Sequence, residues 1–528
     1  MSALLSSVPV ILTQQQERLE APEIDYPAVL PVLIVLGAAC LGVLFEAFLA
    51  KPQRWAAQVT LSLLAVLGAG VALALYLRDA PEQGVVTLAG TVSVDRPGLF
   101  LWGTLLALAL GAVLLIADRT VEPGGHFVAQ AGIRPGTAQD RAQRLGGDMQ
   151  TEVFPLTLFA LGGMMVFCTA NDLLTMFIAL EVLSLPLYLL CGLARRRRLL
   201  SQEAAVKYFL LGAFASAFFL YGLALLYGYA GSVKLVDIAN AAAGANRSDT
   251  LLFAGIGLLV VGLLFKASVG PFHTWTPDVY QGAPTPITAF MAACTKVAAF
   301  GGILRVLTVS LDSTSWEWRG VLWTVAVVSM VIGAVLGLTQ TDVKRMIAYS
   351  SVAHAGFLLV GAIAITPSGL SATLFYLLAY GFTTLAAFGA ISLVRDADGE
   401  ATHLSQWAGL AKRSPLLAGV FTFLLLALAG IPLTSGFVGK FVVFAAGLAD
   451  GMAPLVVIAL VASAVAAFFY LRVIVLMYFS EPVADGPTVS VPGAFTTAAI
   501  TLGVLVTLLL GVVPAFALDW AGGGAFAF

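Results

Sequence analysis

The chain has 528 residues, of which 60% are hydrophobic and only 11% are charged, and its formal net charge is −2. A soluble domain normally carries about 25% charged residues, so the composition excludes an ordinary water-soluble enzyme, and we expect no nucleic-acid partner. Because the lipid interior requires each backbone polar group to be satisfied within its own segment, the sequence predicts an all-α polytopic membrane protein.

Apolar runs of about 20 residues, the length at which a helix crosses a bilayer, recur about fourteen times. The predicted spans are 28–49, 54–77, 98–117, 152–169, 172–193, 203–230, 250–281, 284–308, 319–340, 343–364, 369–394, 415–449, 453–479 and 495–519. Residues 1–27 are predicted to form an extramembrane N-terminal tail, because their apolar piece is too short to span. Residues 118–150 are rich in Gly, Gln and Arg without periodicity, and are predicted to be a cytoplasmic loop insert, either a linker or a partner-facing segment.

The 27 Lys and Arg residues are distributed unevenly along the chain. If the spans alternate in direction, about fifteen fall in one set of loops, six in the other set and six on the spans. Cytoplasmic loops are enriched in Lys and Arg, so the count predicts that both termini face the outer side. The arginine run at 195–198 is then interpreted as a topology anchor rather than a ligand site.

Two spans are interrupted by Gly and Pro: 250–281 carries KASVGP from Lys266, and 415–449 carries AGIP from Ala429. Proline removes a backbone donor and disrupts the turn before it, and at membrane depth the freed carbonyls need protein or water partners. The two spans run in opposite directions by the loop count, which predicts an inverted repeat; two ordinary proline kinks are the alternative. The predicted parts are helices 1–3 (28–117), a five-helix half of helices 4–8 (151–308), a second half of helices 9–13 (319–480), and helix 14 (495–519).

Five charged residues lie inside the apolar runs: Glu181, Lys207, Lys266, Lys296 and Lys440. A charged side chain at mid-bilayer costs roughly 2.5–3.5 kcal/mol even on the lenient insertion scale, and such residues usually mark an ion or proton path. We therefore interpret them as a relay in which charging one site shifts the next. A set of static buried ion pairs is the alternative.

His354 lies in the middle of a span, in RMIAYSSVAHAGFLLVG. Imidazole titrates near neutral pH, which suits a proton shuttle, and a purely structural role is the alternative. The four cysteines form no CxxC pair, the four histidines form no HExxH motif, and no GxGxxG fingerprint is present. We therefore expect no metal, haem, iron–sulfur cluster or dinucleotide in this chain.

Three segments resemble the antiporter-like membrane subunits of respiratory complex I, the NADH:quinone oxidoreductase. They are FKASVGPFHTWTPDVYQGAPTPITAFMAACTKVAAF, which resembles the helix 7–8 region, DVKRMIAYSSVAHAGFLLVG, which resembles helices 9–10, and GIPLTSGFVGKF, which resembles the broken helix 12. The resemblance covers about residues 150–480. NDLLTMFIALEVLSLPLYLL, Lys440 in place of a glutamate on helix 12, and the absence of a long C-terminal lateral helix favour one branch of that family over its paralogues.

The resemblance implies a fourteen-helix fold with inverted five-helix repeats in a bacterial plasma membrane. It implies a subunit of a translocase, in which electron transfer from NADH to quinone drives proton translocation through a chain that holds no redox centre. NAD, FMN, iron–sulfur clusters and quinone would bind partner subunits, and the neighbours would be other antiporter-like and small membrane-arm subunits.

The resemblance also implies a role for each buried charged residue. Glu181 matches the helix 5 glutamate, Lys207 the helix 6 lysine beside it, and Lys266 the lysine of the broken helix 7. Lys296 matches the central helix 8 lysine, His354 the helix 10 relay histidine, and Lys440 the helix 12 lysine toward the outer half-channel.

Three alternatives share the same buried charges. The chain could be a subunit of a multi-subunit cation/proton antiporter, a scaffold subunit whose charges do not conduct, or a relative of the membrane-hydrogenase type. The first and third differ from the complex I interpretation in their partners, and the second predicts that replacing Lys266 or Lys296 leaves proton pumping intact.

Overall fold

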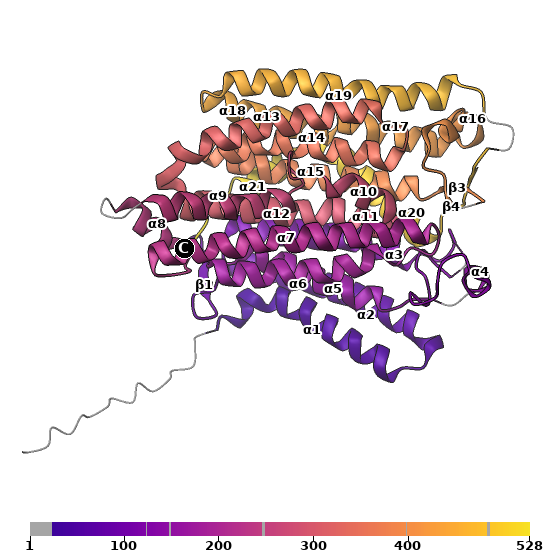
Figure 1. Cartoon of the computed structure of the whole chain (residues 1–528), viewed down its shortest axis with the longest axis horizontal. Coiled ribbons are helices and arrows are strands. Elements are labelled where there is room, and N and C mark those ends of the chain that lie inside the picture. The colour runs from indigo at the N-terminus through magenta and orange to yellow at the C-terminus, as the bar shows by residue number, and fades with distance from the viewer. Residues whose placement is uncertain are drawn as a thin grey trace, which may run out of the picture.

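The computed structural model describes residues 24–122, 124–146, 149–244, 249–397, 399–482 and 486–527. In Figure 1 the long helices lie side by side with their axes close to one direction, and the connecting segments gather at the two ends. The predicted N-terminal tail, 1–27, lies outside the described residues except for its last four positions, so that prediction stays a prediction.

The helices before residue 310 are α1 (Tyr26–Phe48), α2 (Lys51–Asp79), α3 (Arg96–Ala117), α4 (Ala138–Leu145), α5 (Val153–Thr169), α6 (Leu173–Cys191), α7 (Arg198–Ala230), α8 (Leu235–Ala243), α9 (Asp249–Lys266), α10 (Trp275–Gly282), α11 (Thr285–Phe290) and α12 (Lys296–Arg305). The helices after residue 310 are α13 (Ser315–Thr339), α14 (Val343–Ile363), α15 (Pro367–Ile391), α16 (Leu410–Arg413), α17 (Pro415–Ala429), α18 (Ser435–Ala449), α19 (Ala453–Phe479), α20 (Ala494–Val512) and α21 (Ala515–Ala521).

Short π- and 3₁₀-helical turns and strands complete the secondary structure. The π-helical turns η1 (Met291–Thr295) and η2 (Val306–Ser310) join α11 and α12 into one continuous span, and the 3₁₀ turns are η3 (Asp312–Thr314) and η4 (Leu404–Trp407). The strands β1 (Val85–Thr87) and β2 (Val92–Val94) form an antiparallel pair, and β3 (Val394–Asp396) pairs with both β4 (Gly399–Glu400) and β5 (Thr488–Val489).

Twelve helices in the described part of the chain are long and apolar enough to cross a membrane. The other two of the fourteen predicted spans are α5, with 17 residues, and the interrupted pair α17 and α18, with 15 residues each. The prediction of an all-α polytopic membrane protein is confirmed, and the chain is an integral multi-pass membrane protein. The division into repeats at 151–308 and 319–480 stays a prediction.

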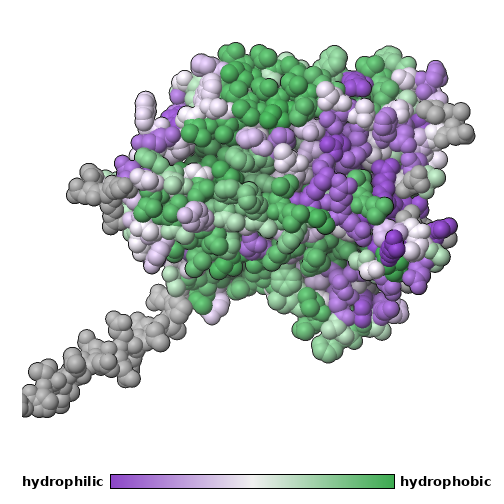
Figure 2. All heavy atoms as spheres, viewed as in Figure 1, coloured by the Kyte–Doolittle hydropathy of each residue, from purple (hydrophilic) through white to green (hydrophobic). Residues whose placement is uncertain are grey.

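Burial divides the spans into a central group and an outer group. The span from α11 through η2 is completely buried, and α14 and α15 are about 94% buried over their most apolar windows. By contrast, the most apolar windows of α2, α7 and α20 are only 33% buried, and most of their exposed large side chains are apolar, as expected for helices that face lipid. Figure 2 shows hydrophobic side chains across the middle of the face in view, over α7 and its neighbours.

Several spans begin where a carboxylate accepts hydrogen bonds from the first free backbone N–H groups of the helix. Asp95 accepts from Gly98 N at 2.8 Å, Asp172 from Thr175 N at 2.7 Å, and Asp342 from Lys344 N at 2.9 Å. Such caps stabilise a helix start by roughly 0.5–2 kcal/mol. They fix the residue at which each of these helices begins.

Both predicted breaks are present. The helix α9 ends at Lys266 and α10 begins at Trp275; Ser268 adopts a φ of 60° between them, and Gly270 N donates to Ser329 Oγ at 3.1 Å. The second break follows α17, where Gly430 has a φ of 86° that a residue with a side chain rarely adopts. These breaks free backbone carbonyls in the interior of the bundle.

The basic loops meet at one end of the molecule. Arg196 Nη1 donates to Ala397 O at 2.9 Å and Arg197 Nη2 to Glu400 O at 2.8 Å, so loops 200 residues apart in sequence are in contact. Hydrophilic side chains gather over this end in Figure 2, where α4 and α16 lie. At the opposite end Ser93 Oγ donates to Ala527 O at 2.7 Å and Asp25 N to Thr87 Oγ1 at 2.9 Å, so the first and last described residues lie together there.

The predicted loop insert, 118–150, is packed against the arginine run. It contains α4, whose Asp140 is fully buried and forms an ion pair of 2.9 Å with Arg198, and Arg195 donates to the carbonyl of Gly124 at 2.9 Å. The sequence did not indicate the helix, because residues 118–150 lack hydrophobic periodicity. It did not indicate these contacts, because the partners are distant in sequence. The arginines at 195–198 therefore hold the insert in place as well as concentrating positive charge.

A buried ion pair anchors the end where the termini lie. Arg305 Nη2 lies 3.0 and 2.8 Å from the two carboxylate oxygens of Asp95, both side chains are fully buried, and Arg305 Nε donates to Cys168 O at 2.8 Å. We expect Arg305→Ala to lower the free energy of unfolding by about 3–5 kcal/mol, because it leaves a carboxylate buried without its cation. Unfolding of the solubilised protein measures it.

Arg319→Ala is the matched control at the same end. Arg319 pairs with Asp450, but its side chain is about a third exposed, so a loss below about 1 kcal/mol is expected. Equal losses for the two variants would contradict the assignment of Arg305 as an anchor.

Candidate functional site

Four of the six predicted site residues lie buried in the interior of the bundle: Lys266, Lys296, His354 and Lys440. None of the three lysines has a carboxylate oxygen within 4.0 Å in the part of the chain that the structure describes. Neutral oxygens therefore hold these lysines, and not the static ion pairs of the alternative interpretation.

Lys266 is the last residue of α9 and lies against α6. Its Nζ donates to Ser184 Oγ at 2.7 Å and to Tyr208 OH at 3.2 Å, and Tyr208 stacks on Trp275 with ring centroids 4.6 Å apart. Ser184 lies three residues after Glu181 on α6, a spacing that puts both on one helix face. Lys266 is thus held beside the glutamate without a direct ion pair.

Glu181 is partly buried, and one of its carboxylate oxygens, Oε1, is buried with no hydrogen-bond partner in the described residues. An unpaired carboxylate oxygen in the interior is costly. The side chain therefore gains from any neighbouring cation or water that comes into reach, which is the property expected of a group that switches partners.

Lys296 begins α12, directly after the π-helical turn η1. Its Nζ donates to Ser351 O at 2.7 Å and, at 3.4 Å, to the carbonyl of Ala267, the first residue after α9 ends. The Tyr380 ring centroid lies 5.5 Å from the same nitrogen. The broken helix thus places one of its carbonyls against the central lysine, immediately next to Lys266.

His354 lies three residues after Ser351 on α14, so the two share a helix face. Its Nδ1 lies 2.7 Å from Tyr376 OH and its Nε2 lies 3.4 Å from Tyr470 OH, and Tyr470 OH is hydrogen-bonded to Ser350 Oγ. Both ring nitrogens thus face a hydroxyl that can donate or accept, which is what a proton shuttle requires.

Lys440 lies on α18 and faces the second break. Its Nζ donates to Leu428 O at 3.0 Å, to Ala429 O at 2.8 Å and to Ser463 Oγ at 2.9 Å. Leu428 and Ala429 are the last residues of α17, so their carbonyls have no helical N–H to accept from. The break therefore creates the binding site of this ammonium group.

Lys207 differs from the other three lysines. Its side chain is 42% exposed, and its Nζ lies 2.6 Å from Glu203 and 2.7 Å from Asp278. The prediction placed Lys207 beside Glu181, but among the described residues the structure shows no ion pair between them. Its carboxylate partners lie one turn away on α7 and on α10 beyond the break, and Asp278 also pairs with Arg345.

Sequence reasoning missed the hydroxyl groups that connect the charged residues. They are Ser184, Tyr208, Tyr376, Ser463 and Tyr470. A signal existed for Ser184, which follows Glu181 at helical spacing. The tyrosines on α15 and α19 lie in otherwise apolar runs and could be recognised only after the helices were packed. In the described residues no group of three His, Cys, Asp or Glu side chains could hold a metal ion.

The family model described as NADH:quinone oxidoreductase/Mrp antiporter, transmembrane, matches residues 170–469. A curated relative from Saccharopolyspora erythraea, NADH-quinone oxidoreductase subunit N, is 77% identical over 96% of this chain and 99% of its own length. The chain belongs to the family of NADH-quinone oxidoreductase subunit N. This is the branch that residues 171–190 and Lys440 favoured. A subunit N from Mycobacterium tuberculosis is 52% identical over 95% of this chain and 98% of its own length.

Solved structures agree on the fold. A chain of respiratory complex I from Thermus thermophilus, solved with aureothin, is 34% identical and superimposes with a TM-score of 0.74, covering 94% of this chain and all of that chain. A chain of the Mrp complex from Dietzia superimposes with a TM-score of 0.79 at 23% identity, covering 95% and 97%. The higher score at lower identity shows that the fold is shared across the family and that sequence separates its branches.

The hydrogen bond between His354 and Tyr376 gives a prediction about stability. We expect Tyr376→Phe to lower the free energy of unfolding by about 1–3 kcal/mol, because it leaves Nδ1 of a buried imidazole without a partner. Unfolding of the solubilised protein reports the loss. Tyr478→Phe, at a tyrosine that is 40% exposed, is expected to change stability by less than about 0.5 kcal/mol. Indistinguishable variants would mean that the hydroxyl is not bonded to His354.

Proposed function

We propose that this chain is a proton-translocating membrane-arm subunit of NADH:quinone oxidoreductase. The observation that supports it is the set of buried lysines held by neutral oxygens at two helix breaks. A carboxylate partner would fix a positive charge on each amine, whereas a carbonyl or hydroxyl accepts from both the ammonium and the neutral amine. Such a site can lose its proton without leaving an uncompensated carboxylate buried beside it.

The proposed relay uses five of the six predicted residues in an order set by their contacts. Glu181 and Ser184 lie beside Lys266, Lys266 lies beside the Ala267 carbonyl that Lys296 contacts, and α14 connects Lys296 to His354. Phe357, three residues further along α14, has its ring 5.2 Å from Lys440 Nζ. Proton transfer between such groups needs contacts of about 2.6–3.2 Å or one intervening water, and His354 has one such contact, at 2.7 Å to Tyr376 OH.

In this mechanism electron transfer elsewhere in the complex changes the charge felt at Glu181. Its partner switches, the proton affinities of Lys266 and Lys296 move in opposition, and a proton entering from the cytoplasm passes His354 and leaves past Lys440. Moving one charge against the membrane potential costs about 2.3 kcal/mol per 100 mV, an amount that a shift of under two pKa units, at about 1.36 kcal/mol each, supplies. Lys207, which is paired with Glu203 and Asp278, acts at the partly exposed edge of the relay.

The partners follow from the same proposal. NADH, FMN, iron–sulfur clusters and quinone bind other subunits, and this chain packs against neighbouring antiporter-like and small membrane-arm subunits in the bacterial plasma membrane. The alternative, a subunit of a cation/proton antiporter, has the fold in its favour. The fold and the buried lysines are common to both interpretations and do not distinguish them. The identities of 77% and 52% to subunits N favour the complex I interpretation.

Lys296→Ala tests the function directly. In the assembled complex we expect NADH-driven proton pumping in vesicles to fall at least tenfold, because the central amine between the two halves is lost. The control is Lys412→Ala, since Lys412 is half exposed and pairs with Glu481 at the basic end; it is expected to pump normally. Unchanged pumping by an assembled Lys296→Ala complex would favour the scaffold alternative.

The orientation has its own test. We expect the basic end to face the cytoplasm, because Lys and Arg are concentrated there. In a background with the exposed native Cys40 replaced by Ser, Ser405→Cys at the basic end is expected to react with a membrane-impermeant maleimide in inverted vesicles but not in intact cells. Labelling of intact cells would reverse the assignment of both termini to the outer side.

A further inference from the structure

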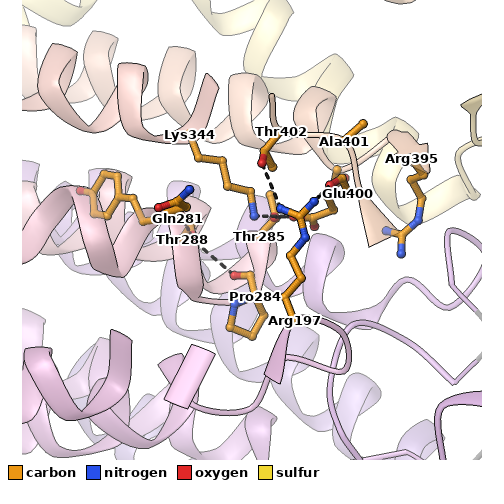
Figure 3. A network of polar contacts seen from close by, with 12 residues as sticks. Arg197, Gln281, Pro284, Thr285, Thr288, Lys344, Arg395, Glu400, Ala401 and Thr402 are labelled. Atoms are coloured by element: carbon orange, nitrogen blue, oxygen red, sulfur yellow. Dashed lines mark hydrogen bonds and ion pairs between the residues drawn. The ribbon is translucent and has the colours of Figure 1, made fainter. Parts of the chain in front are cut away.

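A second group of buried charges lies at the basic end, where α11 and α14 begin. Figure 3 shows Arg197 and Lys344 pointing toward Glu400 from separate elements, with Arg395 beside them and its guanidinium turned away. They border a cavity of about 40 Å³ that is also lined by Glu122 and Ala283. One water molecule needs roughly 10–15 Å³, so this cavity has room for a few.

Glu400 joins the two halves of the chain at this cavity. Thr285 Oγ1, at the start of α11, donates to Glu400 Oε2 at 2.5 Å, and Lys344 Nζ, at the start of α14, donates to the same oxygen. Lys344 is almost completely buried. A single carboxylate oxygen therefore pins α11 to α14.

The Glu400 carboxylate stays ionised. Burial alone would raise the pKa of this carboxyl, but the Lys344 ammonium, the hydrogen bonds from Lys344 and Thr285, and the Arg395 charge together lower the pKa to about 2. The contact with Lys344 therefore does not open by protonation near neutral pH. It can open if another cation takes the carboxylate.

Arg395 is that second cation. Arg395 and Glu400 are directly opposed in the antiparallel pairing of β3 and β4, a position from which side chains interact across strands. Arg395 Nη2 is bound to Glu122, while Nη1 is buried with no hydrogen-bond partner among the described residues. A buried donor of a charged group that lacks a hydrogen-bond partner costs free energy. Arg395 Nη1 would therefore gain from a hydrogen bond to Glu400.

Polar groups continue from this clamp toward Lys296. Thr285 and Thr288 lie one turn apart on α11, which leads through η1 to Lys296, and α14 runs from Lys344 to Ser351, whose carbonyl Lys296 contacts. The Ser351 and Tyr380 hydroxyls are buried with no hydrogen-bond partner in the described part of the chain. Water between such hydroxyls would satisfy them.

We propose that Glu400 is a positioning residue that gates proton entry to Lys296. Bound to Lys344 and Thr285 it closes the mouth of the path, and bound to Arg395 it releases both helices and admits water from the cavity. The proton passes along water and the threonine hydroxyls to the Lys296 amine, each hydroxyl accepting one proton and giving one up. This inference rests on the proposed function and adds to it the residues of the input gate.

The first test asks whether the mouth opens during turnover. The assembled complex carries Cys40→Ser and Ala283→Cys, since Ala283 lines the cavity and is 2% exposed, and a small water-soluble maleimide is applied to inverted vesicles. We expect labelling at least threefold faster with NADH and quinone than at rest. Ser405→Cys, exposed at the same end, is expected to react equally in both states, and the buried native Cys294 in neither. Equal labelling of Ala283→Cys in both states overturns the proposal.

The second test removes the charge of the clamp. Glu400→Gln keeps an oxygen for Thr285 but no longer attracts Lys344, so we expect at least threefold faster resting labelling of Ala283→Cys and at least threefold fewer protons pumped per NADH oxidised. The exposed Glu481→Gln is the control. Unchanged labelling and pumping overturn the gate. If Glu400→Gln does not assemble, the turnover experiment with Glu400 in place decides.

The two proposals fail differently. An assembled Lys296→Ala complex that pumps normally removes the proposed function. If Lys296→Ala stops pumping while Glu400→Gln leaves labelling and pumping unchanged, the relay stands and only the gate is wrong.

Discussion

An ammonium group in the interior of a membrane protein must be given oxygen partners, and the rest of this structure depends on how that is done. In a regular helix the backbone carbonyls are occupied by N–H groups four residues on. Interrupting α9 and α17 frees carbonyls at the depth of the bundle interior, and these bind Lys296 and Lys440. The breaks that weaken two helices are therefore what makes buried lysines tolerable.

The two breaks are used in different ways. At the first, the lysine that contacts the freed carbonyl comes from the neighbouring helix α12, and Lys266 ends the broken helix itself. At the second, Lys440 belongs to α18, the continuation of the broken span, and folds back onto the end of α17. Between the two breaks α14 carries Ser351, His354 and Phe357 at three-residue intervals. Ser351 contacts Lys296, His354 contacts Tyr376, and Phe357 contacts Lys440. The helix α14 is thus the element on which both halves converge.

The fold does not decide how it is used. Chains from complex I, from an Mrp complex and from a membrane-bound sulfane sulfur reductase superimpose on this one with TM-scores of 0.74 to 0.79. What they share is the fold. In our proposal control lies in the Glu400 clamp, which is built from loop residues and helix starts at the basic end.

The sequence by itself determined the class of the protein, the approximate positions of its spans, the positions of both breaks and the burial of Lys266, Lys296 and Lys440. Each of these follows from local rules: apolar length, the chemistry of proline and glycine, and the cost of a charge in lipid. Only the tertiary structure decided which residues are in contact. Lys207 pairs with Glu203 and Asp278 rather than with Glu181, tyrosines from α15 and α19 meet His354, and the insert at 118–150 packs on the arginine run. Apart from the pair Lys207–Glu203, which lies at i,i+4 spacing on one helix, those contacts join residues more than 20 positions apart. A side chain's partner at that range is set by how the helices pack, which no local pattern records.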